Sequence, residues 1–282
     1  MTIVQAIILG IVQGLTEFLP ISSSGHLLLV PWLFNWHFLL ENPDLNKSFD
    51  VALHLGTFVA VVIYFWREIG RLLVAWARSI TRRSLAEPEA RLAWLLIVST
   101  IPAAIVGVVL EDFITNTLGR PWMIGVAMIV FAGFMYLVDH VARLDRDIES
   151  LTWVDAVLIG AAQALALLPG VSRSGITMMT GLLVRLDRES AARYSFLMSI
   201  PVIGGAAAFT ALEIARDGLP SGTAIPFAVG MISAALSGIA AIWFTLAYLK
   251  RHNFNLFVVY RLAVGVGVLI LVVTGVRSGM GI

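Results

Sequence analysis

The stretch QGLTEFLPISSSGH at residues 13–26 (the first cassette) returns in altered form as QALALLPGVSRSG at residues 163–175 (the second cassette). A shift of 150 residues aligns Gly10 with Gly160, Gln13 with Gln163, Ser22 with Ser172, Ser24 with Ser174 and Gly25 with Gly175. The prolines, Pro20 and Pro169, align at a shift of 149. A repeated apolar helix that breaks at such a loop is how membrane proteins build a polar site at bilayer depth. The repeat therefore predicts two hinged helix pairs that share one site.

Composition assigns the chain to the polytopic membrane proteins. Hydrophobic residues make up 59% of its 282 residues, charged residues make up 13%, and the mean hydropathy is +0.91, well outside the range of soluble domains. A net charge of +1 without a basic, aromatic-rich cluster argues against a nucleic-acid partner. The sequence has no cysteine, which excludes disulfides and thiolate metal sites. Because no Lys or Arg precedes Lys47, we expect no cleavable signal peptide.

Six apolar segments approach the length that crosses a hydrocarbon core of about 30 Å. They are residues 51–66, 92–110, 122–138, 196–214, 225–249 and 256–273. The cassettes interrupt two further stretches, 3–33 and 154–183, each of which reads as two short helices hinged at its loop. Non-helical backbone at membrane depth is tolerated only inside protein or beside a water-filled cavity. We therefore expect two re-entrant hairpins; the alternative is four ordinary, short spans.

The distribution of Lys and Arg predicts the orientation. One set of loops holds thirteen of the nineteen basic residues and the opposite set holds four, while Arg173 and Arg261 fall within apolar segments. By the positive-inside rule the richer set is cytoplasmic, so both termini lie outside and the two halves have opposite orientation. The expected fold is an all-α polytopic membrane protein, an inverted repeat with two re-entrant helix hairpins and six transmembrane helices. It forms one domain, residues 1–282, with halves at about 1–143 and 153–282.

The first cassette carries an acid, an imidazole and three hydroxyls. Gln13 and Glu17 lie one turn apart on one face of the helix before the hinge, and His26 opens the returning helix. The Ser22–Ser24 loop precedes a helix N-terminus and suits an anion. A carboxylate can hold Mg²⁺ or Ca²⁺ against phosphate oxygens, and histidine transfers protons near neutral pH.

The second cassette and the last span supply guanidinium groups. Arg173 stands between Ser172 and Ser174 in the second loop, and Arg261 lies within the last span. Ionisable groups inside a membrane are costly, so each calls for a function or a partner. Arginines bind phosphate oxygens through several N–H donors. The combined set favours a phosphate ester or a diphosphate as ligand over a proton relay.

Structural roles compete with these functions. Glu17 and His26 can each form hydrogen bonds within a protein core without a catalytic role. Arg261 can pair with a carboxylate and so hold the last helix in place. The Ser22–Ser24 hydroxyls can serve only as a helix cap. A structural charge in a hinge loop inside the bilayer is expensive, which favours a function for Arg173. Because the cassettes are repeated, we favour function for the set as a whole. A structural role is favoured for two residues at the outer end of a span, Asp50 and His54.

Longer motifs point to a known family. FLPISSSGH at 18–26 and PGVSRSG at 169–175 resemble motifs of the bacterial undecaprenyl-diphosphate phosphatase (bacitracin-resistance) family. The resemblance covers essentially the whole chain, including FDVALHLGT at 49–57, RYSFLMSIP at 193–201 and VYRLAVG at 259–265. It implies hydrolysis of undecaprenyl diphosphate to the monophosphate carrier of cell-wall synthesis, in a bacterial plasma membrane, with a divalent cation (Mg²⁺ or Ca²⁺) as cofactor.

The resemblance also implies roles for individual residues. Carried over by motif, the catalytic positions are Glu17, Ser23, His26 and Arg173, with Glu17 as metal ligand. Many members have a second Glu where this chain has Gln13, so Glu17 and the diphosphate oxygens are expected to do most of the coordination. Further contacts to the substrate are expected from Gln13, Ser22, Ser24, Ser172, Ser174 and Arg261.

We expect in-line displacement at the terminal phosphorus, with Ser23 as nucleophile and His26 as base and then acid. A phosphohistidine at His26 and direct attack by water stay open.

The competing class is a lipid or anion transporter or flippase, because hinged inverted repeats recur in transporters. Phosphatidic-acid-phosphatase-type enzymes are disfavoured, since Met179 stands where their histidine would follow Arg173. The expected partners are a polyprenyl diphosphate lipid and the bilayer, and a homodimer stays open.

Overall fold

The computed structural model describes residues 1–36, 43–109, 118–217 and 222–279, which are helical apart from loops and one isolated bridge between Arg146 and Leu186. Two 3₁₀ helices are η1 (Ile148–Ser150) and η2 (Ala164–Leu167). The α-helices are α1 (Ile3–Phe18), α2 (Ser23–Phe34), α4 (Pro43–Arg82), α5 (Pro88–Val109), α7 (Pro121–Val141), α8 (Trp153–Gln163), α9 (Arg173–Leu183), α10 (Arg188–Asp217), α11 (Ala224–Leu249) and α12 (Asn255–Val273).

Among the described residues, five helices are long and apolar enough to cross a membrane: α4, α5, α7, α11 and α12. They contain five of the six expected spans, although residue 110, at the end of one span, lies outside the described residues. The sixth, 196–214, falls in α10, whose side chains from residue 206 onward are not described. Outward-facing side chains such as Val108 and Leu236 are 79% and 66% exposed. Such apolar surfaces are stable in lipid, so the chain is a polytopic membrane protein.

Both cassettes break a helix in the same manner. The first hinge loop (residues 19–22) joins α1 to α2, and the second hinge loop (residues 168–172) joins η2 to α9. The N-cap residues Ser22 and Ser172 have positive φ angles of 78° and 83°, and each hydroxyl accepts a hydrogen bond from the N–H of the glycine three residues later. The cap offsets the cost of positive φ at a residue that has a Cβ. The predicted breaks are therefore present at both cassettes.

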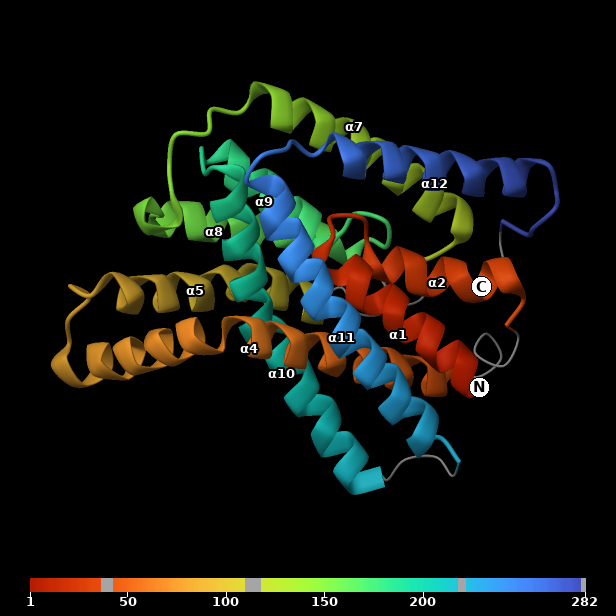
Figure 1. Cartoon of the computed structure of the whole chain (residues 1–282), viewed down its shortest axis with the longest axis horizontal. Helices are drawn as coiled ribbons and strands as arrows, with labels where there is room; N and C mark the ends of the chain where they lie inside the picture. Colours follow the sequence, from red (N-terminus) through yellow and green to blue (C-terminus); the bar gives the residue numbers. More distant parts are fainter. Residues whose placement is uncertain (37–42, 110–117, 218–221, 280–282) are drawn as a thin grey trace.

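The two hinged pairs pack against helices of the opposite half of the sequence. α1 lies along α11, and α8 lies along α5 (Figure 1). Glycines permit these close contacts: a Cβ at Gly10 would lie 2.4 Å from the Gly230 carbonyl oxygen, and one at Gly160 would lie 2.2 Å from that of Ser99. Small residues allow helix backbones to approach each other in membrane proteins. Each half thus supplies the packing surface for the first helix of the other half's hinged pair.

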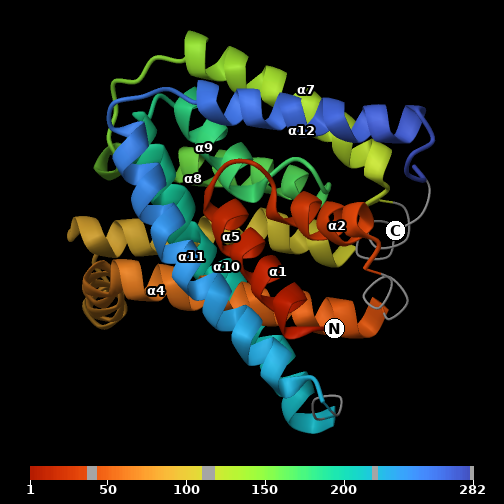
Figure 2. The same cartoon turned by 45° about the vertical axis from the view of Figure 1, so that its right-hand side comes forward.

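α7 and α12 form a further pair along one edge of the molecule, as both views show (Figure 1, Figure 2). The largest buried cluster reaches from α7 and α12 to α9 and α10, where Met178, Leu182 and Leu197 are completely buried. α12 contacts both hinge loops through Arg261, and α7 lies against Gly170 of the second loop. From α10, the carbonyl oxygen of Ser195 binds Arg173, the residue that follows this loop. The fold therefore encloses the cassettes.

Candidate active site at the hinge loops

The two hinge loops contact each other directly. Ser22 Oγ, besides capping α2, accepts a hydrogen bond from the N–H of Gly170 at 3.0 Å. In the other direction, Ser174 Oγ donates to the carbonyl oxygen of Leu19 at 3.2 Å. Gly170 has a φ of +102°, and a Cβ there would lie 2.8 Å from Cβ of Ala127, so a glycine is required at this close approach. Segments about 150 residues apart in the chain are thus held together by reciprocal hydrogen bonds.

Arg261 on α12 is completely buried and binds main chain. Its guanidinium donates to the carbonyl oxygens of Pro20 at 3.2 Å, of Met128 at 3.4 Å and of Gly170. The same group lies over the ring of Phe131, 4.6 Å from its centroid. The sequence predicts a substrate contact for Arg261, whereas its donors here satisfy carbonyl groups of the interior. It does not line the pocket that the cassettes form.

A pocket of about 330 Å³ lies beside the hinge loops. Its volume is within the range of small-molecule sites. Its walls come from both cassettes and from α4 and α10: Glu17, Ser23, Ser24, Val51, His54, Ala166, Ser172, Arg173, Val202 and Ile203. The pocket therefore gathers one carboxylate, one imidazole, one guanidinium and three hydroxyls.

Glu17 accepts hydrogen bonds on both carboxylate oxygens. Oε2 accepts from Ser23 Oγ at 2.7 Å and from Gln13 Nε2 at 3.1 Å. Oε1 accepts from an Nη of Arg173 at 2.9 Å. The side chain is only 5% exposed, and a carboxylate is stable at such burial only when it is paired and hydrogen-bonded. Glu17 is thus the centre of the polar network, and it connects the two cassettes.

Arg173 is the first residue of α9 and extends into the pocket. One Nη donates to the Ser195 carbonyl oxygen at 2.8 Å, while the other binds Glu17. The Ser195 hydroxyl in turn binds the hydroxyl of Thr177 at 2.7 Å. The guanidinium is therefore fixed from two sides at a helix N-terminus, where its remaining N–H groups can bind phosphate oxygens.

His26 lies outside the pocket. Its Nδ1 is 2.7 Å from the Ser22 carbonyl oxygen, and its Nε2 is 2.8 Å from the hydroxyl of Tyr260, whose ring stacks on the imidazole. A carbonyl oxygen can only accept, so Nδ1 carries a proton and Nε2 accepts from Tyr260. The expected Ser23–His26 hydrogen bond is absent, because both ring nitrogens have other partners and Ser23 donates to Glu17.

The remaining cassette residues divide between the pocket and its support. Ser24 and Ser172 line the pocket. Ser174 is buried behind it, with its hydroxyl 3.2 Å from that of Ser172. Gln13 is completely buried; its Oε1 has no hydrogen-bond partner among the described residues, and the same holds for Gln163, its equivalent in the second cassette. These residues shape the site, and two of them reach its surface.

His54 on α4 is a pocket residue to which the sequence assigned a structural role. Its Nδ1 is 2.7 Å from the carbonyl oxygen of Asp50, and its Nε2 lies 3.7 Å from Glu17 Oε2. Ser195 is a second contact that the cassettes do not contain. Both residues stand in motifs at 49–57 and 193–201 that carry the family resemblance. That is the signal in the sequence that identifies them.

Comparison with known proteins identifies the family of the chain. Residues 6–267 match the family model described as Bacitracin resistance protein BacA. The chain belongs to the BacA family. It is similar to proteins named undecaprenyl-diphosphatase, for example those of Desulforudis audaxviator (46% identical over 95% of this chain and 97% of the relative), Pelobacter propionicus (44%, over 99% and 100%) and Rubrobacter xylanophilus (47%, over 93% and 95%).

A divalent cation, which the resemblance implies, would find few protein ligands in the part of this BacA-family chain that the structure describes. Among the residues that the structure describes, no three His, Asp or Glu side chains gather in a metal-binding arrangement. Glu17 is a hard oxygen donor in the pocket wall. Mg²⁺ is commonly held by one or two carboxylates together with substrate phosphates and water. The residues therefore fit a cation that is bound mainly by the substrate.

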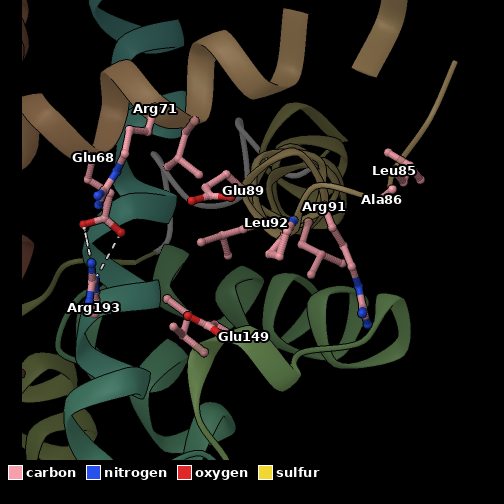
Figure 3. Close-up of a pocket in the computed structure, with 13 residues that line it drawn as sticks. Glu68, Arg71, Leu85, Ala86, Glu89, Arg91, Leu92, Glu149 and Arg193 are labelled. Atoms are coloured by element: carbon pink, nitrogen blue, oxygen red, sulfur yellow. Dashed lines mark hydrogen bonds and ion pairs between the residues drawn. The ribbon is translucent and has the colours of Figure 1, made fainter. Parts of the chain in front are cut away.

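A second cavity of about 390 Å³ lies between α4, α5, η1 and α10 (Figure 3). Its wall holds three arginines and three glutamates: Glu68, Arg71, Glu89, Arg91, Glu149 and Arg193. Figure 3 shows Arg193 facing Glu68, to which it donates at 2.8 to 3.2 Å. Arg91 donates to the carbonyl oxygen of Leu151 at 2.6 Å. The described residues of its wall include no serine, threonine or histidine, so it offers neither a hydroxyl nor an imidazole group to a substrate.

Proposed function

We propose that the chain hydrolyses undecaprenyl diphosphate to undecaprenyl phosphate and inorganic phosphate, and so recycles the lipid carrier of bacterial cell-wall synthesis. Family membership and relatives named undecaprenyl-diphosphatase support this reaction. One observation carries the proposal in this chain. Ser23 and Arg173, from different cassettes, bind the two oxygens of the same buried carboxylate, Glu17. A nucleophile, an anion-binding group and an acceptor for a proton therefore meet in one pocket.

Substrate binding uses the charge of Arg173. Its bond to Glu17 can be exchanged for bonds to the oxygens of the terminal phosphate, because the guanidinium offers several N–H donors in one plane. Ser195 continues to hold it from behind through a carbonyl oxygen at 2.8 Å. The N-terminus of α9 adds a favourable partial charge for an anion. Charge that builds up on the phosphoryl oxygens during transfer is stabilised by the same contacts.

Ser23 is the nucleophile that the geometry supports best, and Glu17 replaces His26 as the group that takes its proton. As Ser23 Oγ attacks, the Oγ–P bond forms, the bond from phosphorus to the bridging oxygen breaks, and the lipid monophosphate leaves with the electron pair. The hydroxyl proton passes along the 2.7 Å hydrogen bond to Glu17 Oε2. Water then attacks the phosphorus of the phosphoserine and the Oγ–P bond breaks. Glu17 returns its proton to Oγ, and inorganic phosphate leaves with both protons of the water.

Glu17, whose Oε1 binds Arg173 in this structure, is the residue that would hold a divalent cation. Such a cation would supply positive charge to neutralise the diphosphate and the leaving group. Ser24 and Ser172 also line the pocket and can donate hydrogen bonds to phosphate oxygens.

For the membrane, we propose an inverted repeat with two re-entrant hairpins, α1–α2 and α8–α9, six spans and both termini outside. The equivalent caps at Ser22 and Ser172 support the repeat. The close packing at Gly10 and Gly160, each against a helix of the other half, supports the opposite orientation of the halves. The charge bias of the loops supports the placement of the termini.

The decisive experiment measures phosphate release from undecaprenyl diphosphate and farnesyl diphosphate by the purified protein, with and without a chelator. We expect release that stops when the chelator is added and resumes with Mg²⁺ or Ca²⁺. A transporter would bind the lipid diphosphate without releasing phosphate. That result would replace hydrolysis with transport as the function of the pocket.

A further inference from the structure

A single side chain of α12 holds both hinge loops. Arg261 donates to the carbonyl oxygens of Pro20 and Gly170, which are separated by the same 150 residues that relate the two cassettes. These carbonyl groups therefore occupy equivalent positions in the two halves. Arg261 itself belongs to neither cassette. One guanidinium thus joins two copies of the same structural feature.

The surroundings of Arg261 favour a structural contact over a free charge. It is 0% exposed, and no carboxylate lies within ion-pair distance of it among the described residues. Its charge is stabilised by three carbonyl oxygens and by the face of Phe131. Two of the three carbonyls belong to different hinge loops. The full set of contacts exists only while the loops stay together, so the cost of burying the charge is offset only in that arrangement.

Each hinge loop leads directly into a pocket residue. The first ends at Ser22 and is followed by Ser23, and the second ends at Ser172 and is followed by Arg173. Ser23 and Arg173 must face the same phosphate, so the separation of the loops fixes the separation of the nucleophile and the anion-binding group. A misplacement of about 1 Å can cost roughly 100-fold in rate.

We propose that Arg261 is a positioning residue: it joins the two hinge loops through Pro20 and Gly170 and so sets the geometry between Ser23 and Arg173, without contacting phosphate. The catalytic part of this inference rests on the proposed function, whereas the joining of the loops does not.

The test compares Arg261→Lys and Arg261→Met with the wild type. Lysine keeps the charge but lacks the planar set of donors that reaches three carbonyls. A positioning role predicts that kcat falls by about 10- to 100-fold in both variants, with KM within about twofold of the wild type. A phosphate contact predicts a raised KM and substantial recovery by lysine. Arg277→Lys is the matched control, because Arg277 also binds a main-chain carbonyl, that of Leu33, at the far end of α2.

A second measurement does not depend on catalysis. The chain has no cysteine, so spin labels can be placed at Ser24, just after the first hinge loop, and at Leu165, just before the second; both residues are exposed. We expect the distance distribution between the labels to widen in Arg261→Lys and to stay unchanged in Arg277→Lys. An unchanged distribution in both Arg261 variants would overturn the proposal. If the wild type released no phosphate, the proposed function would fail, and this distance would still decide whether Arg261 joins the loops.

A double-mutant cycle gives a third readout in the folded protein. Ser22→Ala removes a second direct link between the loops, the 3.0 Å hydrogen bond that Ser22 Oγ accepts from the N–H of Gly170. If both residues act through the same loop contact, the combined loss in kcat is smaller than the product of the single losses. Multiplicative losses would contradict a shared role. Thermal unfolding of each variant in detergent identifies any variant that fails to fold.

Discussion

Ser23 donates a hydrogen bond to Glu17 at 2.7 Å across the first hinge loop. This contact differs from a serine–histidine pair, because the imidazole of His26 is held by the Ser22 carbonyl oxygen and the hydroxyl of Tyr260. In the proposed reaction, this contact makes Glu17 the acceptor of the proton of Ser23.

Ser23→Ala should reduce kcat by roughly 1,000-fold or more, because it removes the attacking oxygen. Ser24→Ala should reduce kcat much less. It removes a neighbouring hydroxyl of the pocket that makes no hydrogen bond to Glu17. Phosphate release measures both effects, and acid quenching followed by mass spectrometry should detect phosphoserine at Ser23 in the wild type. Retention of a third of the activity in Ser23→Ala would favour direct attack by water.

Arg173→Ala should lower kcat/KM by about 100- to 1,000-fold, since lost transition-state contacts of ~3–4 kcal/mol correspond to that factor. The kcat/KM of Arg173→Lys should lie between those of Arg173→Ala and the wild type, because lysine keeps the charge but lacks the planar set of donors. Phosphate release with undecaprenyl diphosphate is the measurement. If Arg173→Ala turned over at more than a third of the wild-type rate, the guanidinium would not be the group that binds the phosphate.

His54→Gln should lower kcat roughly tenfold, because the loss of one polar contact of ~1.4 kcal/mol at the Glu17 carboxylate corresponds to that factor. His140→Gln is the matched control. His140 makes the same Nδ1 contact to the carbonyl oxygen four residues earlier, at 2.7 Å, but lies exposed at the end of α7. Equal activities of the two variants would return His54 to a structural role.

Gly160→Ala should destabilise the protein by about 1–3 kcal/mol, because the added Cβ would overlap the Ser99 carbonyl oxygen at 2.2 Å. Gly133→Ala is the control, since a Cβ at that position in α7 meets no atom within 4 Å. The midpoint of thermal unfolding in detergent should fall for the first variant only. A similar midpoint for both would mean that α8 can move away from α5 at little cost.

The proposed orientation can be tested without any assay of chemistry. A cysteine at Ser84, exposed in the loop after α4, should be shielded from a membrane-impermeant thiol reagent in intact cells, because that loop belongs to the basic set. A cysteine at Ser221, which lies outside the described residues, should be labelled. Labelling at Ser84 from outside would reverse the orientation.

Local pattern was sufficient to predict the helix breaks. Pro20 and the serines after it, and their equivalents near Pro169, interrupt apolar helices, and the caps at Ser22 and Ser172 follow from those residues alone. The proximity of Arg173 and Glu17 could also be inferred from the sequence, because the repeat predicts that the two cassettes share one site.

The partners of His26 and Arg261 could not be predicted in the same way. The hydroxyl that binds His26 belongs to Tyr260, 234 positions later in the chain, and the carbonyls that bind Arg261 come from both hinge loops. Such contacts depend on how α12 packs across the loops, and residue type alone does not encode that. The place of His54 in the pocket could not be predicted for the same reason, since its distance to Glu17 depends on how α4 packs beside α1.

The exchange of packing surfaces between the halves has a consequence for biogenesis. α1 is synthesised first, yet the helix it lies against, α11, begins at residue 224, so most of the chain must leave the ribosome before the first hairpin can be completed. Until then Gln13 and Glu17 stand in the membrane without their final neighbours. Contacts so distant in sequence form late and leave intermediates exposed. A nascent chain that stops before α11 therefore lacks the helix on which α1 packs, and with it the support for the first half of the pocket.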